Sequence, residues 1–253
     1  GGEAFEGLDY AAELGSNFII LVNDNDMSIA ENHGGIYGNL RLLRETGGRA
    51  DCNLFRAMGQ DYRFVADGND LPSVIEALQA ARDIDHPVVV HLVTEKGKGF
   101  APAEAHKEEW HYCAPFDRET FQPLMSTEGE SWESLTANFM MKKMQADSSV
   151  CMITSGTPTV LGFTEDKRRL AGRQFIDVGI AEENAVALAS GIAAAGGRPV
   201  YGVYSTFIQR TYDQLSQDLC INSSILGIEG TVKLIIQYVE DFEKKNNADI
   251  LEK

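Results

Sequence analysis

The sequence predicts an α/β protein built on parallel sheets, with two similar units that follow one another along the chain. The first observation is that short, continuously apolar runs alternate with amphipathic helical stretches, a pattern typical of buried parallel strands and their crossover helices. The second is that this alternation stops over residues 101–133 and then begins again. The third is a composition of 43% hydrophobic and 24% charged residues, which is enough for a sizeable core.

The first unit begins with apolar residues at helical spacing over residues 3–14. The continuously apolar run at 18–22 predicts a strand buried on both faces. Glycines between residues 34 and 38 break the next stretch, so the following helix is expected only over 40–46. A short helix, a short strand, an amphipathic helix and a second buried strand then follow, at 53–59, 64–65, 71–82 and 87–93.

The second unit repeats this alternation after a stretch of prolines and scattered charges, which we interpret as a linker. Helices are expected at 133–145, 182–195 and 207–220, and strands at 150–153, 175–178 and 199–203. The last residues combine apolar positions at helical spacing with a highly charged end, which indicates an amphipathic tail. We predict a first domain at 1–113, a linker at 114–133 and a second domain at 134–221. An unassigned helical tail follows at 222–253.

Charge and cysteine usage narrow the classes of partner. With 22 basic and 38 acidic residues the formal charge is −16, so the surface repels nucleic acid and anionic lipid, and we expect neither as a partner. No apolar run approaches the roughly 18 residues that a membrane span needs, and we expect a cytoplasmic protein. Four well-separated cysteines without a Cys-x-x-Cys pair favour reduced thiols over a zinc site.

Polar side chains follow the first apolar strand directly, as Asn23, Asp24 and Asn25. The carboxyl end of a strand in an open parallel sheet is where ligands bind. Amide and carboxylate oxygens, together with a backbone carbonyl, suit a hard cation such as Mg²⁺. On spacing alone, an ordinary polar turn after a strand remains the alternative.

Long segments in the same order resemble those of the 1-deoxy-D-xylulose-5-phosphate synthases, a transketolase-like family that depends on thiamine diphosphate. They are GGEAFEGL (1–8), LVNDNDMSIAENHGGIYGNL (21–40), VVVHLVTEKGKGFAPAE (88–104) and FIDVGIAEENAVALASGIAAAGGRPVYGVYSTFIQRTYDQ (175–214). The resemblance implies two partial domains of the thiamine-diphosphate-binding type, each on a parallel sheet. The first would bind the pyrophosphate and the second the pyrimidine of the cofactor.

The same resemblance assigns the cofactor contacts. Asn25 matches a side-chain ligand of Mg²⁺, Met27 matches a backbone-carbonyl ligand, and Ser28 lies beside them in the cofactor-binding segment. Glu182 matches the catalytic glutamate, whose carboxyl group hydrogen-bonds the pyrimidine ring and promotes proton transfer within the cofactor. Phe207 matches an aromatic residue that stacks against that ring.

Two further assignments concern the substrate. By resemblance Tyr204 and Arg210 face it, and a planar guanidinium suits a carboxylate or phosphate. His111 matches an active-site histidine. From the residues alone each assignment has an ordinary alternative: a helix-dipole interaction for Glu182, core packing for Phe207, a surface ion pair for Arg210 and a loop histidine without a role for His111.

The implied activity is the condensation of pyruvate with glyceraldehyde 3-phosphate, which gives 1-deoxy-D-xylulose 5-phosphate and CO₂ for isoprenoid precursors, in a homodimer. Two alternatives stay open: a transketolase that uses a ketose phosphate donor, and a non-catalytic fragment or remnant of the fold. The pattern also has departures. Asn69 and Asn184 stand where the family usually has histidine, the family's Gly-Asp-Gly metal motif would lie before Gly1 and is not within this sequence, and the resemblance ends near Ile221, so we expect an incomplete chain.

Overall fold

The computed structural model describes residues 2–124 and 129–218. By its contacts the chain divides into two compact units that differ from the two halves predicted above: residues 1–210, which contain both sheets, and residues 211–253. In the second unit the described element is the helix α9 (Tyr212–Asp218). The amphipathic tail predicted at 222–253 lies outside the described residues. The predicted α/β architecture is confirmed in the first unit, which contains two separate three-stranded parallel sheets.

The first sheet has the strand order β1-β3-β2. Its strands are β1 (Phe18–Asp24), β2 (Asp61–Val65) and β3 (Pro87–Val93). In register, Phe18 lies opposite Pro87 and Asp24 lies opposite Val93. Because the three strands run in the same direction, their carboxyl ends lie at one edge of the sheet.

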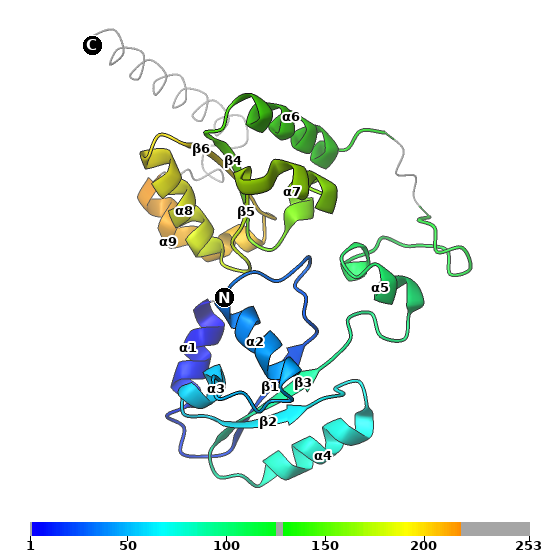
Figure 1. Cartoon of the computed structure of the whole chain (residues 1–253), viewed down its shortest axis with the longest axis vertical. Coiled ribbons are helices and arrows are strands. Elements are labelled where there is room, and N and C mark those ends of the chain that lie inside the picture. Colours follow the sequence, from blue (N-terminus) through cyan, green and yellow to red (C-terminus); the bar gives the residue numbers. More distant parts are fainter. Residues whose placement is uncertain (1, 125–128, 219–253) are drawn as a thin grey trace, which may run out of the picture. The chain divides into compact units, whose positions relative to one another are not determined.

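Helices cover both faces of this sheet (Figure 1). On one face lie α2 (Gly35–Glu45) and α3 (Leu54–Ala57), and on the other lies α4 (Leu71–Arg82), while α1 (Gly2–Ala11) precedes β1. Alternate side chains of β3 point to opposite faces of the sheet and pack into two separate hydrophobic cores. Val89 packs with Leu40, Leu43, Phe55 and Tyr62, whereas its neighbours in β3 pack on the opposite face with Val65 and Ala81.

Two predictions about this unit are wrong. The strand β1 is not buried on both faces: within the described residues it pairs with β3 alone, and Phe18 and Leu21 stay 47% and 53% exposed. The central strand β3 is the fully covered one, and an apolar run cannot tell a central strand from an edge strand. The helix α2 begins at Gly35 and includes Gly38, because the packing of Leu40 and Leu43 offsets the helix cost of glycine.

The second sheet has the strand order β5-β4-β6. Its strands are β4 (Val150–Thr154), β5 (Phe175–Asp177) and β6 (Arg198–Gly202), and the long helices beside them are α6 (Trp132–Ala146) and α8 (Glu182–Ala194). Met152 packs with α6 and Phe163, whereas Cys151 and Ile153 pack with α8. A helix layer on each face of a parallel sheet therefore recurs in both halves of the unit.

Several short helices escaped prediction because they are too short to show a period. The stretch over which the predicted alternation stops, 101–133, contains α5 (Ala101–Ala105) and the 3₁₀ helix η1 (Glu109–His111). Between β4 and β5 lie η2, α7 and η3 (Pro158–Leu161, Glu165–Ala171 and Gly172–Gln174). The helix predicted from residue 207 begins as the 3₁₀ helix η4 (Phe207–Thr211) before α9. The domain boundaries given above stay predictions.

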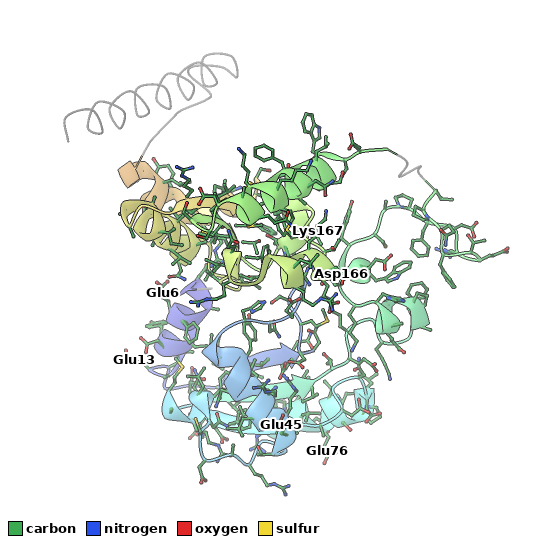
Figure 2. All side chains as sticks on the ribbon, turned by 45° about the horizontal axis from the view of Figure 1, so that its top comes forward. Glu6, Glu13, Glu45, Glu76, Asp166 and Lys167 are labelled. Carbon is green, nitrogen blue, oxygen red and sulfur yellow. The ribbon has the colours of Figure 1, made fainter. Side chains whose placement is uncertain are left out.

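The surface carries many of the acidic side chains. Glu6, Glu13, Glu45 and Glu76 are exposed and belong to different parts of the first half of the chain (Figure 2). In the part of the chain that the structure describes, none of the helices combines the length and apolarity needed to cross a membrane. The described cysteines that are free thiols are Cys52, Cys113 and Cys151.

Candidate functional site

A pocket of about 570 Å³ lies within the first compact unit. Its wall is made by segments that follow strands of both sheets: the turn after β1, the loop after β3, and the segments after β4, β5 and β6. The lining residues are Asn25, Met27, Ser28, Ile29, Lys96, His111, Ser155, Gly156, Thr157, Ile180, Glu182, Phe207 and Arg210. The carboxyl ends of parallel strands, where ligands bind in α/β folds, thus meet at one cavity.

Most of the residues assigned from the sequence line this pocket. They are Asn25, Met27, Ser28, His111, Glu182, Phe207 and Arg210. Tyr204 does not line it; its ring lies edge-on to that of Phe207 with centroids 5.8 Å apart, and the residue is 42% exposed. Asn69 and Asn184 also lie outside the lining. The roles assigned by resemblance stay predictions, but the structure brings residues more than 150 positions apart into one cavity.

The turn after β1 is shaped by local hydrogen bonds. The Oδ1 atom of Asn25 accepts the backbone N–H of Met27 at 3.1 Å, and Asp26 adopts φ 61°, a left-handed conformation that aspartate tolerates better than most residues. Met27 pairs with Glu31 in an isolated antiparallel bridge. Next to this bridge, the hydroxyl of Ser28 donates a hydrogen bond to Oδ1 of Asn32 at 2.7 Å. The turn therefore presents Asn25, Met27 and Ser28 together.

Asp24, next to this turn, is committed to the fold. Its side chain is 2% exposed, and its carboxylate accepts both Nη1 of Arg44 at 2.7 Å and the Nε2 side of the His91 ring at 2.9 Å. The other ring nitrogen of His91 lies 2.7 Å from the Tyr62 hydroxyl. Burial raises the pKa of Asp24, but the hydrogen bonds from His91, Arg44 and the N–H of Asp26 hold it below its usual value. Asp24 is thus a structural anchor.

Glu182 begins α8 and has the properties of a ligand-binding carboxyl group. It is 3% exposed, and its Oε2 atom makes no hydrogen bond within the protein. The nearest cation is Arg210, whose Nη1 lies 3.5 Å from that oxygen and whose Nε lies 3.7 Å from Oε1 of Glu183. A buried polar oxygen without a hydrogen bond is costly, so a ligand with a donor at this position would fit.

Lys96 lines the pocket although the sequence analysis assigned it no role. Its Nζ donates to the carbonyl oxygens of Ser28 at 2.6 Å and Ile29 at 3.3 Å, and burial lowers its pKa. Partial burial and then the charge of Lys96 lower the pKa of His111. The clue in the sequence was the position of Lys96 just after the apolar strand at 87–93, the same place that Asn25 occupies after its own strand.

The oxygen donors present fit a metal only in part. Asn25 offers a side-chain amide and Met27 a backbone carbonyl, two ligands of the six that octahedral Mg²⁺ takes. Asp24 is occupied by Arg44 and His91. Over residues 2–124 and 129–218, no three His, Cys, Asp or Glu side chains gather as a metal site. The pocket itself, with the free oxygen of Glu182, fits the organic part of a cofactor better than it fits a metal alone.

Gly179 precedes Glu182 in a turn that only glycine accommodates well. Its φ is +73°, and a Cβ there would lie 2.9 Å from the carbonyl oxygen of His33. We expect Gly179→Ala to lower the free energy of unfolding by roughly 1–3 kcal/mol, since left-handed strain and this contact add. Urea denaturation measures the effect. Gly191→Ala in α8 is the control: no atom lies within 4 Å of its added Cβ, so it should be neutral or stabilising, and equal losses in both variants would contradict the prediction.

Comparison with known proteins gives a consistent result. The family model described as 1-deoxy-D-xylulose-5-phosphate synthase matches residues 1–51 and 45–94, and the model of the transketolase pyrimidine-binding domain matches residues 128–227. The chain is 37% identical to the 1-deoxy-D-xylulose-5-phosphate synthase of Listeria monocytogenes, covering 90% of this chain and 39% of that protein. It is 35% identical to that of Pelotomaculum thermopropionicum, covering 88% and 40%.

The chain therefore spans about two fifths of the length of these relatives. Among solved structures, a transketolase from Pichia stipitis in complex with a sedoheptulose phosphate matches at 15% identity and a TM-score of 0.30, over 85% of this chain and 43% of that one. At that TM-score the likeness carries no argument. The assignment of the chain to a family rests on the two family models and on the sequence relatives.

Proposed function

Because the chain belongs to the 1-deoxy-D-xylulose-5-phosphate synthase family, we propose that it forms the thiamine-diphosphate site of an enzyme that condenses pyruvate with glyceraldehyde 3-phosphate. The products would be 1-deoxy-D-xylulose 5-phosphate and CO₂. The relatives are named as synthases, which favours this reaction over a transketolase reaction with a ketose phosphate donor.

The observation that carries the proposal is a buried glutamate oxygen that makes no hydrogen bond, in a pocket lined by residues that follow strands of both sheets. Oε2 of Glu182 makes no hydrogen bond within the protein, and the same cavity is lined by Asn25, Met27 and Ser28 from the other half of the unit. Thiamine diphosphate has a pyrimidine ring at one end and a diphosphate at the other. A carboxyl group and a cluster of amide, carbonyl and hydroxyl groups in one cavity match those two ends.

When bound, thiamine diphosphate supplies the carbon that attacks the donor carbonyl. Glu182 would hold or release a proton at Oε2, opposite a ring nitrogen of the pyrimidine. Phe207 would pack against that ring, and its 37% exposure leaves part of its surface available for a ligand. Arg210, a cation that lines the pocket beside Glu182, would bind the anionic substrate. Tyr204, whose ring lies edge-on to that of Phe207, would contact the substrate from outside the lining. His111, whose pKa is lowered, would be neutral at pH 7 and able to exchange a proton with substrate.

The proposal also covers the metal, the location and the assembly. Mg²⁺ would take Asn25 and the carbonyl of Met27, and the diphosphate would supply further oxygens. Free thiols at Cys52, Cys113 and Cys151 support a cytoplasmic location. A homodimer rests on the family resemblance alone. The pocket lining described above comes from one chain.

A calorimetric titration tests the proposal. Thiamine diphosphate should bind this chain in the presence of Mg²⁺ and lose affinity when the metal is removed with EDTA. We expect Asn25→Ala to weaken the Mg²⁺-dependent binding by about 10–100-fold, because it removes an oxygen ligand. Absence of binding to the unaltered chain, or equal affinity with Mg²⁺ and with EDTA, would count against the proposed site.

A further inference from the structure

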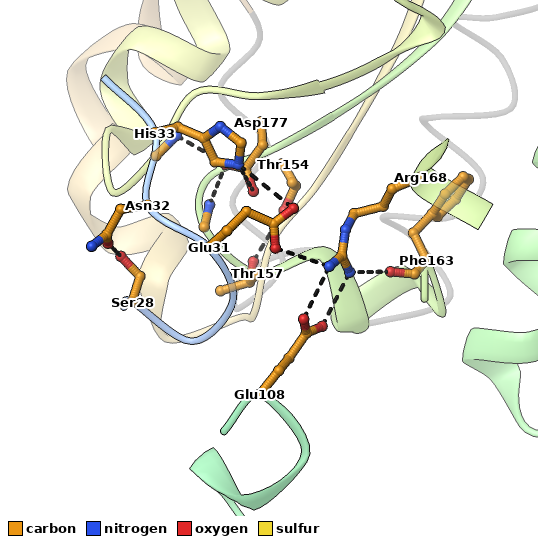
Figure 3. A network of polar contacts seen from close by, with 12 residues as sticks. Ser28, Glu31, Asn32, His33, Glu108, Thr154, Thr157, Phe163, Arg168 and Asp177 are labelled. Atoms are coloured by element: carbon orange, nitrogen blue, oxygen red, sulfur yellow. Dashed lines mark hydrogen bonds and ion pairs between the residues drawn. The ribbon is translucent and has the colours of Figure 1, made fainter. Parts of the chain in front are cut away.

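Arg168 is a buried cation that the proposed reaction does not use. It lies in α7, and its side chain is 8% exposed. Its guanidinium grips Glu108 with two hydrogen bonds, Nη1 to Oε1 at 3.1 Å and Nη2 to Oε2 at 3.0 Å. Nη2 also donates to Oε2 of Glu31 at 2.9 Å, and Nη1 to the carbonyl of the fully buried Phe163 at 2.9 Å. Figure 3 shows the guanidinium between the two carboxylates.

Both carboxylates belong to segments that carry pocket residues. Glu31 pairs through its backbone with Met27, which lines the pocket. The carbonyl oxygen of Glu108 accepts the N–H of His111 at 3.2 Å, and His111 lines the pocket as well. Arg168 therefore contacts the pocket residues indirectly. Through Glu31 it is connected to the turn that contains Met27, and through Glu108 it is connected to His111.

The contacts are of a kind that fixes geometry. A two-pronged arginine–carboxylate pair is short and directional, and its energy is larger when the cation is shielded from water. The carbonyl of Phe163 ties the guanidinium to the core of the second sheet, where Phe163 packs with Met152. Glu31 is half exposed, at 52% for its side chain, and besides Arg168 its carboxylate has a longer contact, with Oε1 4.0 Å from Nε2 of His33. The shorter contact to Arg168 is therefore the stronger restraint on this side chain.

We propose that Arg168 is a positioning residue that holds the turn with Met27 and Ser28, and the η1 turn with His111, against the second sheet so that both face Glu182. The proposal deepens the proposed function, on which it rests for the identity of the ligand. Nε2 of His33 lies 3.8 Å from Oδ2 of Asp177, a longer contact between the same segment and the second sheet (Figure 3). Arg168 touches neither the cofactor nor the substrate in this scheme.

Hydrogen–deuterium exchange of the ligand-free chain tests the positioning directly. In Arg168→Met, peptides covering residues 27–33 and 106–112 should exchange at least about tenfold faster, while the strand β4 keeps its protection, because local opening leaves core strands intact. The control is Arg169→Met. Arg169 is the next residue of α7, and its ion pair with Asp166 is 79% exposed on both sides, so its loss should change neither segment.

Cofactor affinity is the second readout. With Mg²⁺ present, Arg168→Met should raise the Kd of thiamine diphosphate by about 10–100-fold, the usual effect of losing a residue that orients ligands. Arg168→Lys should recover part of that loss, since lysine keeps the charge and loses the fork. Glu108→Gln should loosen residues 106–112 alone, and Glu31→Gln residues 27–33 alone. These two variants keep the test valid if Arg168→Met fails to fold.

The possible outcomes separate this proposal from the proposed function. Unchanged exchange in both segments of Arg168→Met would overturn the positioning role, whatever the cofactor does. Equal loss of protection in β4 and in the two segments would also overturn it, because Arg168 would then serve only global stability. If the unaltered chain binds no thiamine diphosphate but the exchange pattern appears as expected, the proposed function fails and the positioning of the two turns stands.

Discussion

Replacing Glu182 by glutamine is expected to slow the exchange of the thiazolium C2 proton of bound thiamine diphosphate by about 10²–10⁴-fold, the usual contribution of a positioned acid–base group. Glutamine keeps the shape of the side chain and its ability to form a hydrogen bond, but it cannot take or return a proton. Oε2 of Glu182 is free of hydrogen bonds within the protein and lines the pocket, so the variant should retain cofactor affinity within a few-fold.

Quenched-flow exchange into deuterated buffer, followed by NMR of the released cofactor, measures this rate. The matched control is Glu183→Gln. Glu183 is the next residue of α8, does not line the pocket, and has Oε1 3.7 Å from Nε of Arg210. Exchange that is equally slow in both variants would point to a general electrostatic effect of the helix start. Exchange as fast in Glu182→Gln as in the unaltered chain would remove Glu182 from the catalytic role.

Replacing Arg44 by methionine is expected to lower the free energy of unfolding by about 3–5 kcal/mol, the cost of leaving one member of a buried ion pair uncompensated. Arg44 donates to both oxygens of Asp24 at 2.7 Å and also pairs with Asp26, and its side chain is only 15% exposed. Without it, the Asp24 carboxylate would keep His91 and a backbone N–H as its remaining partners. Urea denaturation at pH 7 gives the difference from the unaltered chain.

The pH dependence of that difference is a built-in control. The pKa of Asp24 is lower in the folded protein than its usual 3.8, so its stabilising effect is complete above that value and is lost as the pH falls through the lowered pKa. Once Asp24 is protonated, loss of Arg44 no longer strands a buried charge. The destabilisation by Arg44→Met should therefore shrink below about pH 4. A difference that stays constant into strong acid would show that lost packing, and not charge, is its origin.

Most of the site residues predicted from the sequence line the pocket, and their roles stay predictions. The Asn25–Ser28 turn follows β1 directly, so both local pattern and resemblance pointed to it. Glu182, at the start of α8, was selected by resemblance. Tyr204 was selected by the same route, and the structure leaves it outside the pocket lining. Lys96 lies in a segment that resembles the family, but its position in the pocket depends on hydrogen bonds to the carbonyls of Ser28 and Ile29, 68 and 67 residues away, which the sequence does not show.

Arg168 illustrates a limit of a different kind. Its partner Glu31 lies 137 residues away, and its partner Glu108 lies 60 residues away, in the stretch over which the predicted alternation of helices and strands stops. No local period connects these three residues, and α7 itself is too short to have been predicted. A buried charge is recognisable only once its environment is known, because the sequence of an exposed Arg–Asp pair such as Arg169 and Asp166 looks the same.

The sequence by itself determined the order of helices and parallel strands and the polar turn that ends β1, because strand and helix patterning and turn chemistry act between near neighbours. Resemblance to a known family added the expected cofactor. Only the tertiary structure decided that β1 lies at a sheet edge within the described residues, that Asp24 is held by Arg44 and His91, and that one cavity joins the ends of five strands. Those features depend on which distant segments pack together, and the free energy of that packing is shared among contacts that no local stretch contains.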